Sequence, residues 1–133
     1  MAVKFNDAVL KNKVRVAAFK GVVKSTEALR EEALRLILDT PKSGRLYRRG
    51  NVIHQASAPG EAPASDTGTL VNRMETKFNE DDVSGKLVAN TNYAASLEFG
   101  TFKMEPRPFM RPAVANMRDV ILGFFQNAIR SVK

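Results

Sequence analysis

The chain has 133 residues, of which 44% are hydrophobic and 26% are charged, a balance typical of one globular domain rather than of a disordered chain. It contains no cysteine, which excludes disulfides and thiolate metal sites within this sequence. The sequence has 21 Lys and Arg residues against 14 Asp and Glu residues, which gives a formal net charge of +7. A charge of this sign favours an anionic partner, of which nucleic acid is the most common.

The N-terminal residues lack the apolar core of a signal peptide, and the longest apolar runs are far shorter than a membrane span. We therefore expect no export signal and no contact with a membrane.

The first predicted element is a long helix from about Asn6 to Asp39, a stretch without proline. One face carries an apolar line at helical spacing, formed by Leu10, Val14, Ala18, Val22, Leu29, Ala33 and Leu36. A second apolar line runs along nearly the opposite side, formed by Val16, Val23, Leu34 and Leu38. Because the first line continues across Gly21, we predict one continuous helix of roughly 50 Å with a second side packed on another subunit. The alternative is a break at Gly21 with both halves packed internally.

A basic hairpin and a long loop are predicted to follow. Thr40-Pro41 ends the helix, and Arg45–His54 is expected to form a hairpin that turns at Gly50-Asn51. Residues 55–66 are rich in Ala, Ser, Gly and Pro, so we predict a flexible loop that a neighbouring protein orders. The hairpin region carries four cations without an acid, and we predict that they face DNA or a protein neighbour unless they are merely solvated: Lys42, Arg45, Arg48 and Arg49.

Two half-buried antiparallel strands are predicted next. The alternating pattern of Thr69–Phe78 indicates the first strand, and Val83, Leu87 and Ala89 share one face of the second. The acidic residues Glu80-Asp81-Asp82 lie in the turn between these strands.

The stretch from Tyr93 to Pro112 is predicted to form a helix, an extended crossing and the start of another helix. Asn92–Phe99 has the pattern of one or two helical turns, and Gly100 stands where a positive φ is needed. Pro106 and Pro108 hold the next residues extended. We expect Phe99, Phe102 and the following residues to act as structural anchors: Tyr93, Gly100, Phe109 and Pro112.

A closing helix is indicated by the apolar stripe of Val114, Met117, Ile121, Phe124, Phe125 and Ala128. The predicted fold is therefore α+β: one domain of residues 1–133, in which a long N-terminal helix and a C-terminal helix pack on a small antiparallel sheet with a long loop.

Few residues in the sequence could perform catalysis. His54 is the only histidine, and no phosphate-binding glycine motif is present. Burial would raise the pKa of Glu98, although pairing with Arg107 or Arg111 is the more common arrangement for such a carboxylate. We predict a protein that is not an enzyme, with no catalytic residues, no cofactor and no metal.

Three segments together resemble a known family. They are residues 41–50 (PKSGRLYRRG), residues 54–70 (HQASAPGEAPASDTGTL), and Tyr93–Thr101 (YAASLEFGT) with Arg107–Ala113 (RPFMRPA). This combination resembles the neck and tail-completion proteins, or minor tail components, of long-tailed bacteriophages. The resemblance covers about residues 41–113, and the first 40 residues do not take part in it.

The resemblance implies a structural virion protein that is assembled in the host cytoplasm and has no catalytic residue or cofactor. It implies a hexameric or dodecameric ring of identical copies at the head–tail junction or at the tail end. Its partners would be adjacent connector and tail proteins, with non-specific contact to genome DNA. A basic nucleic-acid-binding module is the alternative function, supported by the charge of +7. A small hydrolase is disfavoured by the lack of catalytic groups.

Overall fold

The computed structural model describes residues 7–65 and 68–132. The elements in chain order are α1 (Asp7–Leu38), β1 (Leu46–Arg49), β2 (Val52–Gln55), α2 (Thr69–Asn72), β3 (Met74–Asn79), β4 (Ser84–Ala89), α3 (Ala94–Phe99) and α4 (Met110–Arg130). The predicted α+β class is confirmed, as are the continuous first helix, the closing helix and the hairpin that turns at Gly50-Asn51. The strands form two separate antiparallel pairs, β1–β2 and β3–β4, rather than one sheet. Within the described ranges, no helix combines the length and apolar character that a membrane crossing requires.

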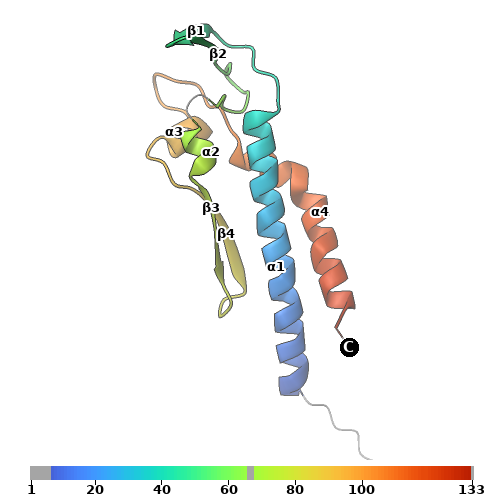
Figure 1. The fold of residues 1–133 in the computed structure, drawn as a ribbon. Helices are drawn as coiled ribbons and strands as arrows, with labels where there is room; N and C mark the ends of the chain where they lie inside the picture. Colours follow the sequence, from blue (N-terminus) through green and yellow to red (C-terminus); the bar gives the residue numbers. More distant parts are fainter. Residues whose placement is uncertain (1–6, 66–67, 133) are drawn as a thin grey trace, which may run out of the picture.

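Helix α1 is the element on which α4 and the β3–β4 hairpin pack (Figure 1). It has 32 residues and is therefore about 48 Å long at ~1.5 Å per residue. Helix α4 lies along one side of it and the β3–β4 hairpin along the other, while the β1–β2 hairpin lies beyond the C-terminal end of α1. The N-terminal end of α1 extends past both α4 and the β3–β4 turn (Figure 1).

Small residues on α1 allow α4 to approach closely. Ala17, Gly21 and Ser25 are buried at four-residue spacing, so they lie on one side of the helix. A Cβ placed on Gly21 would lie 3.0 Å from Cδ1 of Phe125 on α4. A side chain at this position would therefore crowd the Phe125 ring, and the constraint comes from packing and not from backbone conformation.

The β3–β4 hairpin packs on a different side of α1. Gly85 on β4 lies so close to α1 that a Cβ there would overlap the hydroxyl of Thr26. Farther along, the rings of Phe19 and Phe78 meet edge to face, with their centroids 6.4 Å apart. These contacts place the hairpin against α1 without help from α4.

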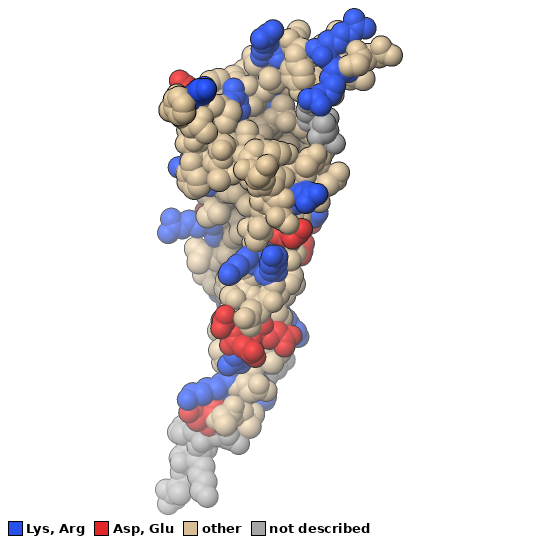
Figure 2. All heavy atoms as spheres, turned by 90° about the vertical axis from the view of Figure 1, so that its left-hand side faces the viewer, with Lys and Arg blue, Asp and Glu red and all other residues tan. Residues whose placement is uncertain are grey.

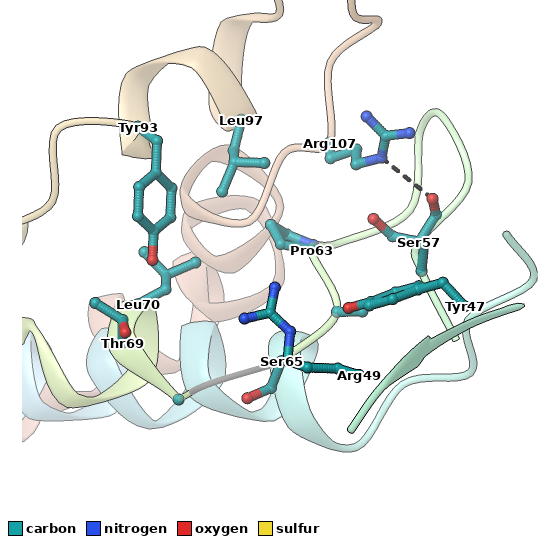
Figure 3. Close-up of a pocket in the computed structure, with 13 residues that line it drawn as sticks. Tyr47, Arg49, Ser57, Pro63, Ser65, Thr69, Leu70, Tyr93, Leu97 and Arg107 are labelled. Carbon is teal, nitrogen blue, oxygen red and sulfur yellow. Dashed lines mark hydrogen bonds between the residues drawn. The ribbon is translucent and has the colours of Figure 1, made fainter. Parts of the chain in front are cut away.

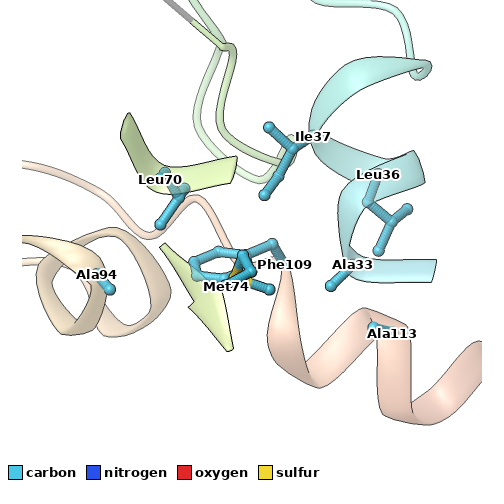
Figure 4. Close-up of a cluster of buried hydrophobic side chains, with 8 residues drawn as sticks. All are labelled: Ala33, Leu36, Ile37, Leu70, Met74, Ala94, Phe109 and Ala113. Carbon is cyan, nitrogen blue, oxygen red and sulfur yellow. The ribbon is translucent and has the colours of Figure 1, made fainter. Parts of the chain in front are cut away.

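The hydrophobic core lies where α1, α2, β3, α3 and the start of α4 meet (Figure 4). Its buried members are Ala33, Leu36, Ile37, Leu70, Met74, Ala94, Phe109 and Ala113. Phe109 projects into the middle of this cluster and is 1% exposed. The residue just before α4 therefore fixes the beginning of that helix to the end of α1.

The predicted apolar line of α1 is buried only in its C-terminal half. Leu36 and Ala33 are in the core, but Leu10 and Val14 are exposed, because α4 and the β3–β4 turn both end beside this part of α1. On the other predicted line, Val16 and Leu38 are also exposed. Helical periodicity identifies the direction of an apolar face, but it contains no information on how far along the helix a partner reaches.

The prediction of a strand over Thr69–Phe78 was wrong for its first part. Residues 69–72 form the short helix α2, which begins after Gly68 at φ 79°, and the strand begins only at Met74. Leu70 and Met74 are both buried. A spacing of four residues satisfies helical and strand periodicity alike, so the pattern could not distinguish the two.

Phe109→Ala should lower the free energy of unfolding by ~3–5 kcal/mol, because it removes a fully buried ring from the core. Phe102→Ala is a matched control, since Phe102 is 95% exposed. Urea denaturation of both variants measures the difference. Equal effects of the two substitutions would contradict the central place of Phe109 in the core.

Candidate functional site

The chain crosses from α3 to α4 through a tight turn that begins at Gly100. Gly100 has φ 77°, as its sequence position predicts, and a Cβ there would lie 2.8 Å from the carbonyl oxygen of Met104. Thr101 and Met104 exchange two backbone hydrogen bonds, of 2.8 and 3.2 Å. The backbone N–H of Arg107 then donates to the carbonyl oxygen of Leu97 at 2.6 Å, and this bond holds the crossing against α3.

Glu98 on α3 caps the N-terminus of α4. Its carboxylate accepts hydrogen bonds from the backbone N–H groups of Phe109 (2.8 Å), Met110 (3.0 Å) and Arg111 (2.8 Å). The next residue is Pro112, which has no N–H, and Ala113 N–H makes the first bond within the helix. One carboxylate therefore satisfies the donors that the first turn of a helix normally leaves without partners. Pro112 is the third residue of α4, and because it has no N–H it needs no acceptor at this position.

The environment of Glu98 keeps it charged. The side chain is 5% exposed, and burial alone would raise its pKa. The three backbone hydrogen bonds and the bond from Arg111 outweigh burial, so the pKa of Glu98 is below its ordinary value. The alternative of pairing is therefore confirmed for Arg111, whose Nε lies 3.1 Å from Glu98 Oε1, whereas Arg107 bonds elsewhere.

The aromatic residues expected as anchors lie mainly outside the core. Phe99 is 66% exposed and carries the Arg111 guanidinium 5.1 Å from its ring centroid, so it supports that arginine instead of packing inside. Phe102 and Tyr93 are also exposed. Of the expected phenylalanine anchors, Phe109 lies in the core, while Phe99 and Phe102 do not.

The loop of residues 56–65 is tied to the crossing and to the end of α1. The Glu61 carboxylate accepts hydrogen bonds from Ala58 N–H at 2.8 Å and from the backbone N–H and hydroxyl of Ser43. Its pKa is lowered to about 2, first by the Ala58 bond and then by the Ser43 bonds. Gly60 N–H donates to Pro106 O at 3.0 Å. The predicted mobility of residues 55–66 stays a prediction. Within that range, Gln55 belongs to β2 and Asp66 lies outside the described residues.

A cleft of about 500 Å³ opens between the β1–β2 hairpin, this loop and α3 (Figure 3). Arg107 stands on one side of it and donates from Nε to Ser57 O at 3.2 Å. The other labelled side chains around it come from the hairpin, the loop, α2 and α3: Tyr47, Arg49, Pro63, Ser65, Thr69, Leu70, Tyr93 and Leu97. The cleft is mixed in character, with aromatic, aliphatic and basic groups.

The four predicted basic residues do not form one cluster. Lys42 is half-buried and donates from Nζ to Leu36 O at 2.8 Å. Its positive charge therefore lies at the negative end of the α1 dipole. Burial lowers its pKa, and the charge of Glu61 partly opposes that effect. Arg45, Arg48 and Arg49 are exposed on the hairpin, where Arg48 Nε donates to Gly50 O at 3.0 Å. His54 stacks on Tyr47 with ring centroids 5.6 Å apart, a contact between the two strands of the hairpin.

The outer face of the hairpin carries exposed apolar side chains, and sequence reasoning missed them. Directly opposed residues share a face of an antiparallel pair. This face therefore carries Leu46, Arg48, Ile53 and Gln55. Tyr47 and Arg49 occupy the other face and line the cleft. Ile53 is 70% exposed, and Leu46 is also exposed. The sequence did contain a signal for this surface. Leu46 and Arg48 are two residues apart, so they share a face of β1, and a turn at Gly50-Asn51 places Ile53 opposite Arg48.

The titratable side chains singled out from the sequence make structural contacts. Within residues 7–65 and 68–132, no three His, Asp or Glu side chains are grouped as metal ligands. His54 is used in stacking on Tyr47, and Glu98 is used in capping.

Comparisons of the chain with models of protein families, with curated proteins and with solved structures each found no match.

Glu98→Gln keeps the shape of the cap and removes its charge, so it should lower the free energy of unfolding at neutral pH by about 1.5–3 kcal/mol. Because the pKa of Glu98 is lower in the folded chain than in the unfolded chain, its contribution is present above the unfolded pKa, about 4.3, and is lost as the pH falls through the folded value. Denaturation of the variant should therefore depend less on pH in this acidic window. Glu105→Gln, at an exposed residue of the same crossing, is the control. An equal loss in both variants would contradict the capping role.

Glu61→Gln weakens the bonds that hold residues 56–65, so limited proteolysis should cleave this loop faster in the variant than in the wild type. Glu31→Gln, on the exposed side of α1, should leave the rate unchanged. If the wild-type loop is already cut as fast as the variant, the Glu61 contacts do not restrain it and the mobility predicted from composition is correct.

Proposed function

We propose that this protein is a structural virion subunit of a long-tailed bacteriophage. It assembles with itself into a ring at the head–tail junction or at the end of the tail and serves head–tail joining or tail completion. The ring is hexameric or dodecameric, is assembled in the host cytoplasm and contacts the adjacent connector and tail proteins.

The observation that carries this proposal is that the three segments of the resemblance contact one another. Ser43 in the first segment bonds to Glu61 in the second, and Ser57 and Gly60 in the second bond to Arg107 and Pro106 around the third. Separate sequence segments that meet in one spatial unit are what a shared fold would produce. Chance similarity of three short segments would not require them to meet.

The distribution of exposed apolar side chains also supports self-assembly. Leu10 and Val16 are exposed at the N-terminal end of α1, Leu46 and Ile53 on the β1–β2 hairpin, and Leu122 on α4. These positions lie on different elements and at opposite ends of α1 (Figure 1). A ring subunit needs two different surfaces, one for each neighbour, because its contacts are heterologous. Exposed apolar side chains in several places match that need.

A basic module that binds nucleic acid is the second candidate, because Arg45, Arg48 and Arg49 are exposed on one projecting hairpin. Such binding would use phosphate contacts and would carry no sequence preference. The apolar residues Leu46 and Ile53 beside the arginines favour a protein partner instead.

Size measurement by light scattering over a series of protein concentrations tests the proposal. We expect the mass to rise from a monomer to a closed oligomer, and electron microscopy with isolated virion components should show rings at the neck or tail end. A protein that stays monomeric and fails to join virion components would refute the proposal.

The triple variant Arg45→Gln, Arg48→Gln, Arg49→Gln separates the two functions. For a ring subunit whose hairpin arginines face a neighbouring protein, assembly weakens and affinity for duplex DNA is unchanged. For the nucleic-acid module, DNA affinity falls and its dependence on salt becomes less steep.

A further inference from the structure

The outer face of the β1–β2 hairpin lacks cover from the rest of the described chain. Leu46, Arg48 and Ile53 share this face, and both apolar members are exposed. A two-stranded hairpin alone is at best marginally stable in water. On this face, exposed apolar side chains lie next to the positive charge of Arg48. A complementary surface would offer an apolar hollow next to negative charge.

The other end of the molecule has such a hollow. A concavity of about 670 Å³ lies between the N-terminal end of α1 and the β3–β4 turn. Its apolar lining consists of Leu10, Val14, Ala18 and Val83. The projection of α1 beyond α4 leaves this hollow open on the subunit.

Negative charge adjoins the hollow. Glu80, Asp81 and Asp82 precede Val83 in the β3–β4 turn and are exposed. Figure 2 shows blue side chains gathered at the top, over the β1–β2 hairpin, and a red group much lower, over the β3–β4 turn.

Two cations also line the hollow, and both have partners within the subunit. Lys11 Nζ pairs with Asp7 at 2.9 Å. The Arg15 guanidinium donates to the backbone carbonyl oxygens of Glu80 and Asp81, so it does not use the side-chain carboxylates of the turn.

We propose that the β1–β2 hairpin of one copy docks into this hollow of a second copy. Ile53 and Leu46 enter between Leu10, Val14 and Val83, while Arg48 on the same face meets the carboxylates of Glu80 and Asp81. The exposed Arg45, which precedes Leu46, adds positive charge beside this face. The two surfaces differ and lie at opposite ends of α1, so the contact is heterologous and can be repeated from copy to copy. This inference rests on the self-assembly in the proposed function and names the surfaces that perform it.

Charge reversal tests whether these two surfaces face each other. The hairpin variant carries Arg45→Glu and Arg48→Glu, and the turn variant carries Glu80→Lys and Asp81→Lys. Each alone should weaken self-association at least about tenfold, because like charges then meet across the contact. An equimolar mixture of the two variants, or one chain carrying all four substitutions, should recover most of the lost association.

The matched control carries Lys86→Glu and Arg118→Glu, which change the net charge by the same amount as the hairpin variant at exposed positions on β4 and α4. It should associate like the wild type. Circular dichroism and denaturation midpoints of all variants should stay close to those of the wild type, since none of the substituted side chains is buried.

Cysteine pairing gives an independent measurement, because the natural chain contains no cysteine. Ile53→Cys mixed with Leu10→Cys should form a disulfide-linked heterodimer under mild oxidation. Ile53→Cys mixed with Leu122→Cys, on exposed α4, should form at least about tenfold less, because collision without docking pairs thiols slowly.

The outcomes separate this inference from the proposed function. If the wild type assembles while the charge variants lose nothing, or if the four-substitution chain recovers nothing, the hairpin does not dock in the hollow and the ring uses other surfaces. If the wild type never self-associates, both the docking and the ring are refuted.

Discussion

The hydrogen bonds of the Glu98 carboxylate are the interaction on which the arrangement of helices depends. They join the end of α3 to the first turn of α4 at the residue that precedes α4, Phe109, whose ring fills the core. The carboxylate contributes in two ways: its oxygens accept hydrogen bonds from N–H groups that have no partner within the helix, and its negative charge lies at the positive end of the helix dipole. Without this cap, the buried N–H of Phe109 and the partly buried N–H of Met110 would lack their partner, and the start of α4 would lose its fixed place against α1.

A second carboxylate, Glu61, holds the loop in a comparable way. It gathers donors from Ser43 and Ala58, and Gly60 then bonds to Pro106 in the crossing. The small residues of this loop bring little apolar area, so backbone hydrogen bonds take over the role that side-chain packing has in the core. The loop and the crossing are thus bonded to each other, and the loop directly follows the β1–β2 hairpin in sequence.

Elements of the fold were predictable wherever a local signal is strong. The absence of proline and the helical spacing gave α1, and Gly50-Asn51 gave the β1–β2 turn. The exposure of Leu10 and Phe99 was not predictable, because it depends on where α4 ends and on the position of Arg111. The capping bonds of Glu98 join residues 11 to 13 positions apart through a turn whose shape the sequence pattern does not specify. Among the basic residues, Lys42 was grouped with the arginines by proximity in sequence, whereas its ammonium group points to the end of α1.

The close approach of α1 and α4 has a consequence for synthesis of the chain. Gly21 meets Phe125, and Glu32 bonds to Asn116, which is 84 residues away in sequence. At roughly 5–20 residues per second, the ribosome releases α1 several seconds before its main helical partner exists. During that interval the Gly21 side of α1 is open to any apolar surface in the cell. Contacts of such high sequence separation also form slowly, since closing a long loop precedes the gain from packing. The emerging chain is thus most exposed to misassociation in the period before the last helix is made.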